Sequence, residues 1–142
     1  MKRLMILLAV ESIAFSTIFG YQAIESSMFS QAQINRIEKQ IAVTLGSPIP
    51  KQQIDAAMLL HHMVDLNPSN DWNRCIIPLM QVLNRETNDP AARVVAAMVL
   101  HELRSERGDF AISRNAQFTD DARVKRYCTI LSRVRLLEKI KS

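Results

Sequence analysis

Two ten-residue stretches of this chain are near-copies of each other, and they constrain its fold more than any other feature. The stretch 54–63 reads IDAAMLLHHM, and the stretch 94–103 reads VVAAMVLHEL. The copies begin 40 residues apart (94 − 54), a period typical of helical hairpins that stack into solenoids. The same residue stands at five positions of both copies: Ala56 and Ala96, Ala57 and Ala97, Met58 and Met98, Leu60 and Leu100, and His61 and His101. The repeat therefore predicts two equivalent buried helices that lie side by side and share one core.

The rest of the chain divides into helical pairs around these copies. Apolar residues recur at spacings of three and four, and Gly, Pro, Asn and Asp stand at the breaks. The pattern predicts helices at 31–45 and 51–65, at 71–85 and 91–105, and at 110–118 followed by a last helix capped by Thr119-Asp120. Pro78 is expected to kink the third of these helices or to delay its regular start. Val and Ile form no alternating runs, so the predicted fold class is all-α.

The last pair is expected to be a shortened unit that closes the stack. Ala122-Arg123-Val124 repeats Ala92-Arg93-Val94 at an offset of 30 residues (122 − 92), ten fewer than the main period. The residues expected to face inward from the last helix are Val124, Tyr127, Cys128, Leu131 and Val134. Those expected on its outer face are Lys125, Arg126, Arg133, Arg135, Lys139 and Lys141. A polar outer face suits a terminal unit, because no further unit covers it.

The first 23 residues have the layout of an export signal. Two basic residues open the segment, an unbroken apolar run follows, and Ala23 offers a small residue for cleavage. Glu11 and Tyr21 fit this layout poorly, so an uncleaved membrane-associated helix and a soluble helix remain open. The expected organisation is a signal peptide or hydrophobic helix at 1–23, a linker at 24–30 and a repeat domain at 31–142. We expect a periplasmic or secreted protein, or a cytoplasmic one if the segment is no signal.

Three stretches carry a family resemblance. NDPAARVVAAMVLHEL and TDDARVKRYCTIL resemble the second helices of HEAT-like repeats, of the short type also seen in the phycobilisome-lyase group, and IIPLMQVL resembles a first helix. With its signal-like start, the chain is similar to small exported bacterial HEAT-like proteins over about residues 31–137. The resemblance implies a short α-solenoid of about three HEAT-like hairpins. It implies almost nothing about activity, because such repeats are scaffolds for many tasks.

The histidines and cysteines of the repeat are expected to be structural. His61 and His101 stand at equivalent places and could approach each other, but two nitrogen ligands make a poor zinc site. Glu102 is not followed by the second histidine of a zinc-protease motif. Cys75 and Cys128 lie on expected inward faces, where buried free thiols are favoured over a disulfide. We therefore expect no metal and no cofactor.

Two arginines at equivalent places are expected to bridge the units. A stack sets Arg93 and Arg123 in register, with Asp89, Asp120 and Asp121 as candidate partners. Binding of an external partner is the alternative for both arginines. The sequence has no Gly-rich phosphate loop and no Ser elbow, so we expect neither an enzyme nor a small-molecule substrate.

Two functions of different class follow from these expectations. The first is a non-enzymatic module that binds a protein, possibly a second copy, along its second helices; its candidate contact residues are Arg93, Arg123, Arg126 and Arg133. The second is a nucleic-acid-associated protein whose basic last helix contacts phosphates. A formal charge of +4 is mild for a nucleic-acid binder, and an export signal argues against it. Chaperoning of a pigment-binding protein rests on the resemblance alone. Membrane contact is expected only through an uncleaved 1–23 segment.

Overall fold

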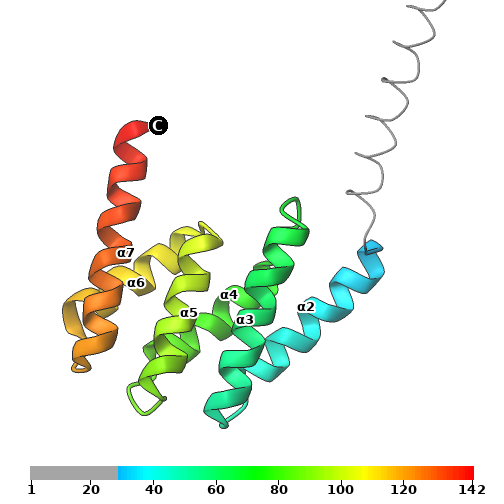
Figure 1. Ribbon diagram of the computed structural model, residues 1–142, viewed down its shortest axis with the longest axis horizontal. Coiled ribbons are helices and arrows are strands. Elements are labelled where there is room, and N and C mark those ends of the chain that lie inside the picture. The colour runs from blue at the N-terminus through cyan, green and yellow to red at the C-terminus, as the bar shows by residue number, and fades with distance from the viewer. Residues whose placement is uncertain (1–28) are drawn as a thin grey trace, which may run out of the picture. The chain divides into compact units, whose positions relative to one another are not determined.

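The computed structural model describes residues 29–142 of the chain, which form α-helices and no strand (Figure 1). The predicted segment 1–23 and most of the predicted linker lie outside these residues. The described helices are α2 (Gln31–Leu45), α3 (Pro50–Leu66), α4 (Asn73–Asn84), α5 (Pro90–Glu102), α6 (Glu106–Phe118) and α7 (Ala122–Lys141). The expected all-α class is thus confirmed for the part of the chain described.

The described residues belong to two units. Residues up to Ile34 form the end of the first unit, in which Ser30 and Gln33 cap α2 reciprocally. The Ser30 backbone N–H donates to Gln33 Oε1 at 2.8 Å, and the Gln33 N–H donates to Ser30 Oγ at 3.3 Å. This exchange satisfies donors that the first turn of a helix leaves free. Asn35–Ser142 forms the second unit, to which the rest of the description applies.

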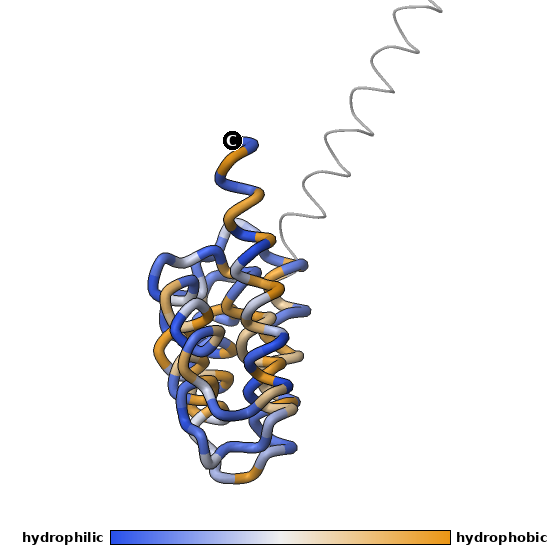
Figure 2. The backbone as a smooth tube through the Cα atoms, turned by 90° about the vertical axis from the view of Figure 1, so that its left-hand side faces the viewer, coloured by the Kyte–Doolittle hydropathy of each residue, from blue (hydrophilic) through white to orange (hydrophobic). Residues whose placement is uncertain are grey.

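Helices of the second unit lie in two layers. In one layer α3 contacts α5 and α5 contacts α7; in the other α4 contacts α6, while α4 with α5 and α6 with α7 connect the layers (Figure 1). Figure 2 shows the layers from the side, with hydrophobic stretches repeating along the helices and hydrophilic residues at most of the turns. The near-copies fall on α3 and α5, so the two equivalent helices do lie side by side. Ala57 and Ala97 are 1% and 0% exposed, as the small residues of a close helix contact should be.

Capping chemistry sets the start of α5. Asp89 accepts hydrogen bonds from the backbone N–H groups of Ala91 and Ala92, at 2.8 and 3.3 Å, and Pro90 stands in the first turn. A carboxylate at this position also faces the positive end of the helix dipole. The expected cap at Asp89 is therefore confirmed, although α5 ends at Glu102, three residues before the expected end.

The predicted start of the third pair is wrong. The helix begins at Glu106 instead of residue 110, and Ser105 caps it by accepting from the Gly108 N–H at 3.0 Å. Gly108 makes no turn. It is buried inside α6, where a Cβ atom would stand 3.2 Å from the Leu100 carbonyl oxygen and 3.3 Å from Leu100 Cδ2. The glycine therefore serves the close approach of α6 to α5.

Pro78 lies inside its helix and does not set where the helix starts. The helix α4 begins at Asn73, two residues later than predicted, after Trp72 in the left-handed region (φ 51°). It then runs across Pro78 to Asn84. Pro78 is the sixth residue of the helix, so the loss of its N–H affects a single bond near the N-terminal end. The Trp72 side chain is buried in the core.

Candidate functional site

A groove of about 420 Å³ runs along the layer of α3, α5 and α7. Met58 and Met98, at equivalent places of the two copies, lie on its wall and are half exposed. The other apolar residues that line it are Val95, Val99 and Leu131, and the polar ones are His61, His101, Glu102, Arg104, Arg135 and Glu138. The groove thus joins an apolar wall to a rim that carries both signs of charge.

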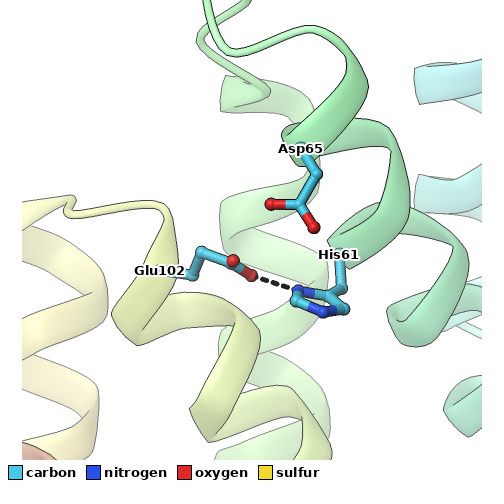
Figure 3. Close-up of side chains that lie close together, drawn as sticks. All are labelled: His61, Asp65 and Glu102. Carbon is cyan, nitrogen blue, oxygen red and sulfur yellow. Dashed lines mark hydrogen bonds and ion pairs between the residues drawn. The ribbon is translucent and has the colours of Figure 1, made fainter.

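A hydrogen bond between His61 and Glu102 crosses from α3 to α5 at this rim (Figure 3). Nδ1 of His61 lies 2.6 Å from Oε2 of Glu102. This hydrogen bond, which outweighs the partial burial of the ring, raises the pKa of His61 above its usual value, and the charges of Glu102 and Asp65 add to the rise. Asp65 follows His61 by four residues on α3, so its carboxylate stands over the same face.

The pKa of His101, at the equivalent place of the second copy, is shifted in the opposite direction. Burial, followed by the positive charge of Arg135, lowers its pKa. Its Nδ1 is buried and finds no hydrogen-bond partner among the described residues. His61 is thus hydrogen-bonded to Glu102, the residue that follows His101, and not to the Nδ1 atom of His101. The equivalence of the two histidines in the sequence does not predict this pair.

Arg135 is inward, and its predicted place on the outer face of α7 is wrong. Its Nε donates to Asp109 Oδ1 at 3.0 Å, and its Nη1 to Glu138 Oε2 at 2.6 Å. It also donates to the carbonyl oxygen of His101, near the C-terminal end of α5. Because Asp109 lies within α6 instead of in a turn, it stands where Arg135 can reach it. This arginine thus connects three helices.

Arg93 is buried in a second network, which joins neighbouring helical hairpins of the second unit. It donates to Glu86 at 2.8 and 3.1 Å, and to the Leu83 carbonyl at 2.8 Å. On α6 it donates to Asn115 Oδ1 at 3.0 Å, and it also reaches Thr119 Oγ1 at 2.9 Å. The hydrogen bond from Arg93, followed by that from Thr119, outweighs the small effect of burial and lowers the pKa of Glu86. Bridging by this arginine is confirmed.

The partners expected for Arg93 are wrong. Asp89 caps α5, and Asp121 caps α7 by accepting from the Val124 N–H at 2.9 Å. Glu86 can reach the guanidinium because it lies two residues after α4, whose last turn is hydrogen-bonded to Arg93 through Leu83 and to Asn115 through Asn84. The sequence does not indicate Glu86, because this residue lies between two helices and helical spacing relates only residues of the same helix.

The other three candidate arginines are exposed on α7: Arg123, Arg126 and Arg133. They border four apolar side chains that share a face of the helix and are 40–57% exposed. This apolar row is Tyr127, Ile130, Val134 and Leu137. The inward positions predicted for Tyr127 and Val134 are therefore wrong, whereas Val124 and Cys128 are buried as predicted.

The apolar row continues the groove. Leu131, which lines the groove, is four residues from Tyr127 and three from Val134, so all three side chains are neighbours on the helix surface. Figures 1 and 2 show the last turns of α7 extending beyond the neighbouring helices, with hydrophobic and hydrophilic residues alternating. The closed, polar end face predicted for the last unit is thus replaced by a mixed surface.

Both cysteines are free and buried, as expected. Burial raises the pKa of Cys75 to about 12 and that of Cys128 to about 11, so neither thiol ionises near neutral pH. Neither belongs to the groove or to the apolar row. They serve packing, and the Cys75 thiol also donates to the carbonyl of Glu38 at 3.6 Å.

No family model, no curated protein and no solved structure matches this chain. Among the described helices, none is both long enough and apolar enough to span a bilayer. The groove and the apolar row adjoin each other along α5 and α7.

Proposed function

We propose that this protein is a short α-solenoid of about three HEAT-like hairpins that binds another protein and has no enzymatic activity. The helix contacts support the architecture, because alternate helices contact each other within a layer: α3 with α5, α5 with α7, and α4 with α6. Stacked hairpins produce this arrangement and leave an extended face free for partners. The face proposed for binding is the layer of α3, α5 and α7.

One observation carries the proposal: apolar side chains stay exposed along this layer. Met58 and Met98 are half exposed in the groove, and the apolar row of α7 adjoins them through Leu131. Contiguous exposed apolar surface of this kind marks interaction sites in soluble proteins. Methionine suits such a face, since its flexible thioether adapts to different partners. We propose that the row packs against apolar side chains of the partner.

The charge of α7 indicates an acidic partner. The helix carries seven Lys and Arg and one Glu, a net charge of +6 (7 − 1). The whole chain carries +4, so the rest of it is at −2 (4 − 6). Two copies that met through α7 would oppose like charges, whereas an acidic amphipathic segment would match both the cations and the row. We propose such a segment as the partner.

Charge-reversal variants test this function. The full chain is used to capture proteins from the native host, next to Arg126→Glu with Arg133→Glu on α7 and to a matched pair, Arg36→Glu with Lys39→Glu, on α2. Both pairs change the charge equally and replace exposed residues. We expect the α7 pair to lose a partner that the α2 pair keeps, and the purified partner to bind directly. Equal capture by all three proteins would refute the assignment to α7.

Nucleic-acid binding is the alternative, favoured only by the charge of α7. Phosphate contacts would make binding to duplex DNA weaken steeply with salt. The apolar row speaks against it, because protein–DNA interfaces are polar and strongly basic. Absence of duplex binding at low salt would remove this alternative.

We further propose that the protein is exported. The support is the layout of residues 1–23, which lies outside the described part of the chain. Mature protein from the native host should begin near Ile24. An intact Met1 in a cytosolic fraction would contradict export.

A further inference from the structure

We propose that His61, Asp65 and Glu102 form a binding site for a divalent transition-metal ion of the zinc class, at the rim of the groove. One ligand atom of each residue lies within 4.8 Å of the other two (Figure 3). His61 and Asp65 stand four residues apart on α3 and so share a face, and Glu102 reaches them from α5. No motif of the sequence assigns this cluster.

The ligand types and distances suit such an ion. Zinc binds imidazole nitrogen and carboxylate oxygen at about 2.0–2.2 Å, so tetrahedral ligand atoms stand roughly 3.3 Å apart. The ligand atoms of His61 and Glu102 are 2.6 Å apart, and no two ligand atoms of the cluster are more than 4.8 Å apart, so these distances lie around the ideal value. Both carboxylates reach solvent and can rotate, Asp65 being exposed and Glu102 partly so. Small side-chain movements therefore complete the geometry.

The charges of the cluster also favour a cation. Two carboxylates face one imidazole, and the charges that act on His61 are those of Glu102 and Asp65. The nearby Arg135 is engaged with Asp109 and Glu138. A divalent ion would balance the two carboxylates. The imidazole favours zinc-class ions over Mg²⁺ and Ca²⁺, which prefer oxygen ligands.

At two of the three positions that build the cluster, the residue 40 positions away in the chain is of a different type. Asp65 corresponds to Ser105, and Glu102 corresponds to His62, at the same offset of 40 residues. The equivalent of the His61–Asp65 pair is thus missing from α5, and the equivalent of Glu102 is missing from α3. Repetition of the unit does not explain the cluster, which exists only where the two different copies meet. Three protein ligands leave one position for water, as in open zinc sites.

Calorimetric titration of the full chain with Zn²⁺ alone tests this site. We expect one ion per chain and a rise in Tm, because the ion would bind α3 and α5 in the folded state only. Asp65→Asn and His61→Ala should each weaken binding by at least about tenfold, the least that loss of an outer partner of a metal ligand commonly costs. His62→Ala is the matched control and should bind as the wild type does, since His62 is exposed next to the cluster.

Two outcomes would overturn the site. One is a wild-type Kd weaker than about 1 mM. The other is zinc binding that Asp65→Asn leaves within about twofold of the wild type, which would place the ion elsewhere. Asp65 is exposed, so its replacement by the isosteric asparagine keeps the fold, and the test does not depend on the stability of His61→Ala. Circular dichroism of each variant confirms the helix content.

Discussion

At the scale of single residues, equivalent positions of the repeat differ in burial and in hydrogen bonding. Arg93 is 1% exposed and bridges α4, α5 and α6, while its equivalent Arg123 is exposed on α7. A spacing in the sequence predicts that two residues occupy similar places. It does not predict which of them binds a carboxylate, because Glu86 lies in a turn and the next hairpin has no equivalent residue at a fixed spacing.

Arg93→Ala should destabilise the fold strongly. The change removes the donor that Glu86, Asn115 and the Leu83 carbonyl share, while Glu86 keeps the hydrogen bond from Thr119. We expect a loss of about 3 kcal/mol in the free energy of unfolding, the lower end for breaking a buried pair, because Glu86 is half exposed. Urea denaturation measures it. Arg123→Ala, at the equivalent surface position, should stay within about 0.5 kcal/mol of the wild type; a similar loss in both would contradict the assigned role of Arg93.

The same network should make stability depend on acid pH. Arg93 lowers the pKa of Glu86 in the folded protein, so the unfolded state binds a proton first as the pH falls. The stabilisation by this pair is full above the ordinary pKa of a glutamate and disappears as the pH falls through the lowered value. Thermal unfolding of the wild type and of Glu86→Gln between pH 7 and 3 checks it: the difference in Tm should shrink towards pH 3, and a constant difference would count against this linkage.

At the scale of elements, the sequence predicts helix positions well and helix ends less well. The spacing of apolar residues locates every described helix, and the Asn-Asp-Pro turn identifies Asp89 as a cap. Residues 106–109 were missed, because Gly108 is typical of a turn when its neighbours are unknown. Residue 108 is a glycine because Leu100, on another helix, lies too close to leave room for a Cβ atom. Arg135 was misplaced for the same reason: its partner Asp109 belongs to the part of α6 that was missed.

Gly108→Ala should therefore destabilise the protein, although alanine is the better helix former. The new Cβ would stand 2.9 Å from Ser105 Oγ, the cap of α6, and 3.2 Å from the Leu100 carbonyl. Overpacking destabilises a protein by about 1–3 kcal/mol, and the higher helix propensity of alanine offsets up to about 1 kcal/mol of this. We therefore expect the free energy of unfolding to fall by about 1 kcal/mol. Urea denaturation next to Gly46→Ala, where a Cβ meets one backbone atom, tests this; a gain in stability would disprove the close approach.

At the scale of the second unit, the two near-copies predicted the central helix contact, and the candidate site was predicted only in part. The sequence indicates Arg123, Arg126 and Arg133 as contact residues. It does not indicate the apolar row beside them, because helical spacing places Tyr127 and Val134 in the core. The groove and the cluster of His61 with Glu102 depend on how α3 and α5 lie together. Helical spacing within one element carries no such information.

The affinity of the purified partner for apolar variants tests the central claim most directly, that the layer of α3, α5 and α7 is the binding face. Calorimetry compares the wild type with Met98→Ser and Ile130→Ser, and with Phe110→Ser as the control, since Phe110 is an exposed apolar residue of α6. We expect Kd to rise at least about tenfold for the first two variants, as for interface residues that contribute strongly, and to stay unchanged for Phe110→Ser. Unchanged affinity in Met98→Ser and Ile130→Ser, with a loss in Phe110→Ser, would contradict the account.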